Sequence, residues 1–145
     1  MFSNLTAARL AYQRKMRELK KKQRKTNKYN AKVAKAGGRR FDSEFECSVY
    51  AVLQRQERVG EITNLRHQHQ VRFTDAGITW RLDFSFTRDG AQWFAEAKGL
   101  ETEAYLIKKK LWRVYGIGPL EIWRGTAANP RHTETIIPTP LRVTT

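Results

Sequence analysis

The spacing of the apolar residues predicts two amphipathic helices in the body of the chain. The predicted helices span residues 43–59 and 104–115, where apolar side chains recur every three or four positions. Ser43 and Glu46 match a capping box at the start of the first helix, and Gly60 follows its end. Gly116 ends the second helix.

Apolar and polar residues alternate between these helices, which is the pattern of half-buried β-strands. The expected strands are 62–73, 78–86, 92–98 and, after the second helix, 120–123. Residues 75–77 and 88–90 are predicted turns. The order of helix, three strands, helix and strand predicts an α/β fold in which helices flank a mixed central sheet.

Strict alternation also predicts which side chains share a face of a strand. The apolar residues at the even positions 80–86 are expected on one face of the second strand, and Asp83 on the other. His67 and His69 are expected to share a face of the first strand. Two histidines on one face could bind a metal ion, but no third metal ligand stands at a suitable spacing. We therefore expect these two histidines to be structural.

Positive charge is concentrated at the N-terminus. Residues 1–40 contain 14 Lys/Arg and one acid, whereas residues 41–145 contain 14 Lys/Arg and 13 acids. Such a basic block favours nucleic acid, because contacts with phosphates release condensed counterions; a solvated segment that aids solubility is the alternative. Apolar spacing predicts a helix over residues 4–25, and residues 26–40 are expected to form a flexible linker.

Ten basic residues are candidates for contact with nucleic acid. They are Arg14, Lys15, Lys20, Lys21, Lys22, Arg24 and Lys25 in the N-terminal arm, and Lys108, Lys109 and Lys110 in the second predicted helix of the body. The three consecutive lysines are expected to form one phosphate-contacting face.

The composition narrows the class of protein further. The chain has 145 residues, enough for one domain, and 40% of them are apolar, so a hydrophobic core is expected. No run of 18 apolar residues is present, so we expect no membrane span, and the N-terminus lacks the apolar stretch of a signal peptide. Cys47, the single cysteine, excludes an internal disulfide and is expected to pack in the core. We expect a cytoplasmic protein organised as a basic arm and linker (1–40), a core (41–124) and an irregular C-terminal tail (125–145).

Asp83, Glu96 and Lys98 are the strongest candidates for chemistry. Glu96 and Lys98 lie two residues apart on a predicted strand, so both point to one face, and the preceding hairpin can bring Asp83 beside them. Charged groups on inner strands are costly unless they are paired or bind a metal. Oxygen ligands alone favour a hard cation such as Mg²⁺. An ordinary ion pair with Lys98 on a solvated face is the alternative.

The same residues resemble a known motif. Asp83, twelve intervening residues and then Glu96-Ala97-Lys98 resemble the PD-(D/E)xK nuclease signature, although Leu82 replaces the usual proline before the first acid. The resemblance covers roughly residues 41–124. It extends to a small bacteriophage family of that superfamily, related to phage junction-resolving endonucleases. It implies a restriction-endonuclease-like core.

The resemblance also implies roles for individual residues. Asp83 and Glu96 would bind Mg²⁺, for which Mn²⁺ would substitute, with the carbonyl of Ala97 as a further ligand. Lys98 would position or activate the attacking water. Glu46 would be a catalytic helical carboxylate that helps to hold a second metal or its water shell, which competes with its role in the capping box.

Together these features predict a metal-dependent endonuclease that hydrolyses phosphodiester bonds of DNA. Branched DNA such as a four-way junction is the expected substrate, and the location is the cytoplasm of a bacterial host if a phage encodes the protein. Cutting both strands symmetrically requires two sites, so we expect a homodimer. The alternative is a non-catalytic DNA- or RNA-binding protein that keeps a nuclease-like core.

Overall fold

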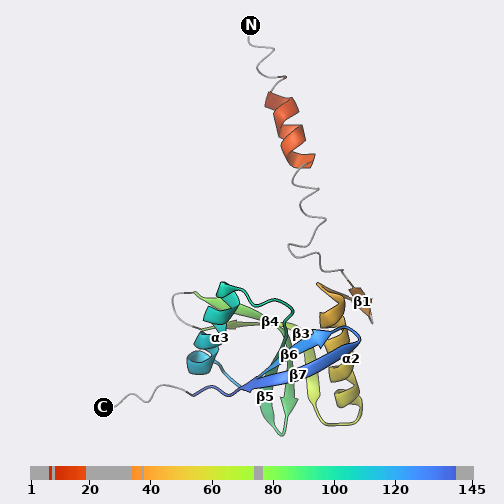
Figure 1. The fold of residues 1–145 in the computed structure, drawn as a ribbon, viewed down its shortest axis with the longest axis vertical. Helices are drawn as coiled ribbons and strands as arrows, with labels where there is room; N and C mark the ends of the chain where they lie inside the picture. The colour runs from red at the N-terminus through yellow and green to blue at the C-terminus, as the bar shows by residue number, and fades with distance from the viewer. Residues whose placement is uncertain (1–6, 8, 19–33, 37, 74–76, 140–145) are drawn as a thin grey trace, which may run out of the picture.

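The structure is a computed structural model that describes residues 7, 9–18, 34–36, 38–73 and 77–139 (Figure 1). Residues 9–18 of the arm are helical, as predicted. The other elements are β1 (Ala34–Ala36), β2 (Arg39–Phe41), α2 (Glu44–Arg58), β3 (Thr63–Arg72), β4 (Thr79–Arg88), β5 (Ala91–Ala97), α3 (Glu103–Tyr115), β6 (Leu120–Thr126) and β7 (Asn129–Ile136). The predicted order of helix, three strands, helix and strand is confirmed. No helix in the described part of the chain is long and apolar enough to cross a membrane.

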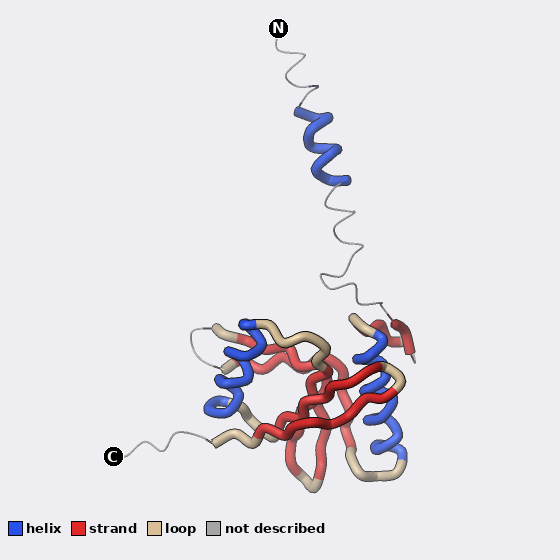
Figure 2. Tube along the Cα trace, viewed as in Figure 1, coloured by secondary structure: helices blue, strands red, loops and turns tan. Residues whose placement is uncertain are grey.

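A mixed five-stranded sheet forms the centre of the molecule (Figure 2). Its strands lie in the order β3-β4-β5-β6-β7, and every neighbouring pair is antiparallel except β5 and β6. Parallel neighbours need a crossover connection, which α3 provides. The protein is therefore a mixed α/β protein with a mixed sheet flanked by helices.

Short-range signals set several element boundaries. The Ser43 hydroxyl caps α2 by accepting a hydrogen bond from the Glu46 N–H at 3.0 Å. The Thr102 hydroxyl caps α3 in the same way. Asp89 and Gly90 both have positive φ, as a two-residue turn between antiparallel strands requires, and this confirms the predicted hairpin between β4 and β5.

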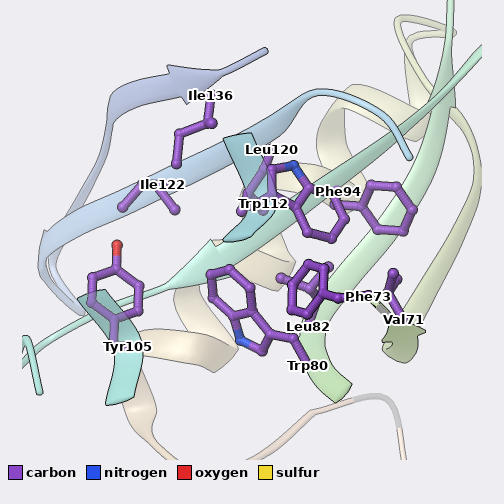
Figure 3. Packing of buried hydrophobic residues seen from close by; sticks show 10 residues of the cluster. All are labelled: Val71, Phe73, Trp80, Leu82, Phe94, Tyr105, Trp112, Leu120, Ile122 and Ile136. Carbon is purple, nitrogen blue, oxygen red and sulfur yellow. The ribbon is translucent and has the colours of Figure 1, made fainter. Parts of the chain in front are cut away.

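Each helix covers its own hydrophobic cluster, and the helices lie on opposite sides of the sheet (Figure 1). The α3 cluster comprises Val71, Phe73, Trp80, Leu82, Phe94, Tyr105, Trp112, Leu120, Ile122 and Ile136. Figure 3 shows this cluster, in which Trp80 lies between Phe73 and Tyr105 with ring centroids 6.3 and 5.9 Å away. The α2 cluster comprises Phe41, Val49, Tyr50, Leu53, Ile62, Phe84, Phe86, Ala95 and Trp123, with Cys47 packed against it.

The predicted alternation of β3 and β4 is wrong in the middle of both strands. His67 packs against Phe84 in the α2 cluster, whereas His69 contacts Phe94 in the α3 cluster, so the histidines do not share a face. Gln68, between them, has a φ of 60°. This left-handed residue interrupts the pleat, and the side chains beyond it change sides.

The same change occurs in β4 at Asp83. Trp80 and Leu82, before Asp83, belong to the α3 cluster, whereas Phe84 and Phe86, after it, belong to the α2 cluster. The even positions 80–86 therefore do not share one face, as simple alternation predicted. Asp83 therefore lies where the apolar side chains of β4 change from the α3 side of the sheet to the α2 side.

The predicted boundaries of the core are wrong at both ends. Part of the expected linker forms the hairpin β1–β2, whose Phe41 is fully buried. The expected irregular tail contains β7, which pairs with β6 and buries Ile136. Pro130 is compatible with β7 because β7 is an edge strand, where a missing N–H leaves no ladder bond unmade. The described residues do not include residues 75 and 76 of the predicted turn. They also do not include residues 4–6 and 19–25 of the predicted arm helix.

Candidate active site

A cavity of about 550 Å³ opens where α2 begins and where β4 and β5 separate. Four acids line it: Asp42 just before α2, Glu46 of α2, Asp83 of β4 and Glu96 of β5. Lys98, just after β5, completes the polar part of the wall. The fold therefore brings together five residues that span more than fifty positions of the sequence.

The carboxylates of Asp83 and Glu96 replace the backbone ladder between their strands. Regular β4–β5 pairing reaches Phe84 and Ala95 and goes no further toward the cavity. Beyond that pair, the Asp83 N–H donates to Glu96 Oε2 at 3.2 Å, and the Ala97 N–H donates to Asp83 Oδ2 at 2.8 Å. Each carboxylate thus accepts a hydrogen bond from a backbone N–H of the other strand. These two hydrogen bonds hold both carboxylates where β4 and β5 separate.

The two carboxylates are electrostatically costly in this position. Burial, and then the negative charges of Glu96 and Glu46, raise the pKa of Asp83 well above its ordinary value. Burial also raises the pKa of Glu96 from 4.5 to about 7, although the positive charge of Lys98 acts in the opposite direction. A site that gathers acids whose charged forms are disfavoured is suited to binding a cation, because the cation stabilises those charged forms.

Lys98 is positioned by an aromatic ring. Its ammonium nitrogen lies 4.8 Å from the centroid of the Tyr105 ring, a cation–π contact with the first turn of α3. Tyr105 is itself buried in the α3 cluster. The ammonium is therefore held beside the acids without a direct ion pair to either Asp83 or Glu96 among the described residues.

Glu46 contributes to the start of α2 and also lines the cavity. The Ser43 cap forms, but the Glu46 side chain bonds the backbone N–H of Asp42 at 3.0 Å, one residue earlier than a regular capping box requires. Its other oxygen lies 2.7 Å from Nε2 of His67. Glu46 is only 4% exposed, and it faces the cavity with both carboxylate oxygens already hydrogen-bonded.

His67 contacts a residue of the cavity wall but does not line the cavity itself. Its ring packs against Phe41 and Phe84, with centroid distances of 4.7 and 5.6 Å, while Nε2 meets Glu46. Glu46 is 21 positions away in the sequence, and no local motif links the two residues. The prediction of a structural histidine agrees with the packing of the ring, but nothing in the sequence indicated the contact with Glu46.

The donors at the site fit a hard divalent cation held by two acids. Mg²⁺ is commonly bound by one or two carboxylates, with water and substrate phosphate completing its shell. Asp83 Oδ1 and Glu96 Oε1 have no hydrogen-bond partner within the described part of the chain, so both are available. No three His, Cys, Asp or Glu side chains of the described residues are grouped closely enough to hold an ion by themselves.

The basic residues predicted to contact nucleic acid are not equivalent. Lys108 lies near Glu96, where its charge opposes the rise in the pKa of that carboxyl caused by burial, whereas Lys109 pairs with Glu134 of β7 at 2.6 Å. Lys110 is exposed. The expected single face of three lysines is therefore not formed, because consecutive helical residues point about 100° apart. Arg14 and Lys15 are exposed on the arm helix, and Lys20, Lys21, Lys22, Arg24 and Lys25 lie outside the described residues.

The fold and site define a mixed α/β protein with a buried acidic cavity beside a lysine. A family model described as a protein of unknown function (DUF1064) matches residues 26–117, and the chain belongs to this family. The match includes Glu46, Asp83, Glu96 and Lys98 and ends before β6. No curated protein and no solved structure shows significant similarity to the chain.

Proposed function

We propose that the protein is a metal-dependent DNA endonuclease of the PD-(D/E)xK superfamily, with a restriction-endonuclease-like core. The reciprocal bonding of Asp83 and Glu96 at the point where β4 and β5 separate carries this proposal. The two carboxylates share a cavity with Glu46 and Lys98, which are the other residues of the proposed catalytic set.

Asp83, Glu96 and the carbonyl of Ala97 would hold Mg²⁺, with Mn²⁺ as a substitute. The ion would supply Lewis-acid activation of water and neutralisation of developing charge on the phosphate. Lys98 positions the water and stabilises negative charge near the reacting phosphorus, since its ammonium is held at the cavity wall. Glu46, each of whose oxygens makes one hydrogen bond, would help to hold a second ion or its water shell from the α2 side of the cavity.

The charge distribution supports a nucleic-acid substrate. Most of the net charge of +14 lies in residues 1–40, where backbone contacts with phosphate are favoured over sequence reading. A branched DNA such as a four-way junction is the proposed substrate, and a homodimer would place two sites on its two strands. The location we propose is the cytoplasm of a bacterial host.

Cleavage of labelled DNA tests the proposal. Wild-type protein is expected to cut a four-way junction in Mg²⁺ or Mn²⁺ but not in EDTA. Asp83→Asn and Lys98→Ala should each lower the rate at least about a thousandfold while leaving the dissociation constant for DNA within about threefold. Glu103→Gln changes an exposed acid of α3 outside the cavity and should cut at the wild-type rate.

The alternative function is non-catalytic binding of DNA or RNA. The concentration of charge in the arm favours it, because the arm can bind phosphates without the cavity. Tight binding with no cleavage of junction, duplex or single strand in either metal would establish this alternative and overturn the nuclease. Competition between RNA and DNA duplexes would then identify the ligand.

A further inference from the structure

A second cavity of about 300 Å³ adjoins the acidic one. The two cavities share Glu96, Lys98 and Thr102 in their walls, so they are separated by little more than these side chains. On its far side the second cavity is lined by Arg81 of β4 and Lys108 of α3. Its wall therefore carries three cations and a single acid.

These three cations have no direct ion pair in the described part of the chain, although Glu96 lies near Lys98 and Lys108. Arg81, Lys98 and Lys108 form no ion pair with a carboxylate there. Other half-buried basic residues of the core are paired, as Lys109 is with Glu134 and Arg88 with Glu121. Lys98 and Lys108 are half-buried as well, whereas Arg81 is exposed. Burial of the two ammonium groups without an ion pair carries a desolvation cost, which the contact with the Tyr105 ring offsets in part for Lys98.

We infer that this second cavity binds a phosphate of the substrate strand next to the one that faces Asp83 and Glu96. An anion there would provide the missing partner of Arg81 and Lys108. Lys98, in the shared wall, would lie between the two phosphates. The identification of the anion as a strand phosphate rests on the proposed function. The excess of cations over acids in the wall is observed independently of that function.

The shared wall explains why the two phosphates would be neighbours. Successive phosphates of one strand are separated by a single nucleotide, and the cavities are separated by the side chains of Glu96, Lys98 and Thr102. The second cavity would thus fix the register of the strand over the acids, which positions the reacting phosphate before any chemistry occurs.

Binding can be measured without cleavage through the indole signal of Trp80. Trp80 lines the second cavity, and all four tryptophans lie outside residues 1–40, so binding to the arm does not directly affect this signal. The full-length protein, in EDTA and with ¹⁵N-labelled indoles, is titrated with the pentanucleotide dT5. Comparison ligands are its uncharged methylphosphonate analogue and inorganic phosphate. The spectrum of Trp80→Phe assigns the signal.

We expect dT5 to shift the Trp80 signal and the uncharged analogue to leave it unchanged. Lys108→Met and Arg81→Gln should each weaken the dissociation constant for this shift about threefold or more. Arg66→Gln removes the same charge from an exposed position of β3 and should leave the constant nearly unchanged. Lys108→Met keeps the apolar stem of the side chain, and matching thermal unfolding of all variants establishes that they fold.

Three results would overturn the inference. They are an unmoved Trp80 signal, equal weakening by Arg66→Gln, and an equal response to inorganic phosphate, which would assign the cavity to free phosphate. Because EDTA removes metal and no bond is cut, this outcome is independent of the cleavage test. A protein that cuts DNA without the Trp80 response would retain the proposed function and lose only the second phosphate site.

Discussion

The carboxyl group of Glu96 is expected to make the stability of the metal-free protein depend on pH. Its pKa is about 7 in the folded protein and ordinarily 4.5, so the folded state binds its proton more tightly than the unfolded state. The contribution of Glu96 to the free energy of unfolding therefore falls as the pH rises from about 4.5 to about 7, by up to about 3 kcal/mol. The raised pKa of Asp83 acts in the same direction.

Urea unfolding in EDTA at about pH 5 and pH 8 measures this effect. Glu96→Gln cannot ionise, so it should be destabilised less than wild type by the same increase in pH. Addition of Mg²⁺ at pH 8 should restore stability to wild type and not to Glu96→Gln. A wild-type protein that loses no more stability than Glu96→Gln between pH 5 and pH 8 would contradict the assigned direction.

The contact of His67 with Glu46 is expected to contribute to stability beyond the packing of the ring. His67→Phe keeps an aromatic ring between Phe41 and Phe84 but leaves Glu46 without one of its partners. Removing a partner of a buried charged group costs about 2 kcal/mol. In the Glu46→Gln background the same substitution should cost clearly less, and a coupling free energy below about 0.5 kcal/mol would contradict the role given to this contact.

At the scale of elements, the site exists because two strands stop following the regular pleat at the same place. Gln68 lies in β3 with positive φ, and Asp83 lies in β4 where the apolar side chains change sides. Past Asp83, β4 and β5 are joined through carboxylates instead of backbone groups. The irregularity therefore creates both the acidic pair and the cavity in front of it.

The edge strand β7 is expected to be essential to the core, although its sequence resembles an irregular tail. Ile136→Ala should lower the free energy of unfolding by about 2–5 kcal/mol, because Ile136 is 4% exposed within the α3 cluster. The neighbouring Ile137 is 68% exposed, and Ile137→Ala should change stability by less than about 0.5 kcal/mol. Urea unfolding of both variants checks the difference, and equal effects would exclude β7 from the stabilising core.

At the scale of the whole molecule, the basic arm and the core are expected to contribute separately to binding. Removal of residues 1–33 deletes eleven Lys/Arg and one Glu but retains β1 and β2, whose Phe41 packs in the α2 cluster. DNA affinity should fall, and the slope of log K against log salt should flatten by about 0.9 for each phosphate that the arm neutralises in the full chain. The melting temperature should stay close to that of the full chain.

Fluorescence anisotropy at several salt concentrations measures this slope. Residual metal-dependent cleavage at high protein concentration is expected, since the shortened chain retains the whole acidic cavity. A slope unchanged by the deletion would show that the arm does not bind phosphates.

The sequence alone predicted the features that depend on neighbouring residues. Helical spacing and the Ser43 cap located α2, alternation located β3 to β5, and Asp89-Gly90 located the hairpin turn. The candidate set of Asp83, Glu96 and Lys98 came from spacing and from resemblance to a motif, and its chemical role stays a prediction. Local conformational preference and periodicity are properties of short segments, so they can be seen without the fold.

Only the tertiary structure decided which distant residues meet and which way each strand faces. It placed His67 against Glu46, paired Lys109 with Glu134, and added β7 to the sheet. A single left-handed residue such as Gln68 reverses every side chain that follows it, and nothing in the alternation of β3 reveals the reversal. The contacts of His67 and Lys109 join residues 21 and 25 positions apart, where the free energy of contact outweighs local pattern.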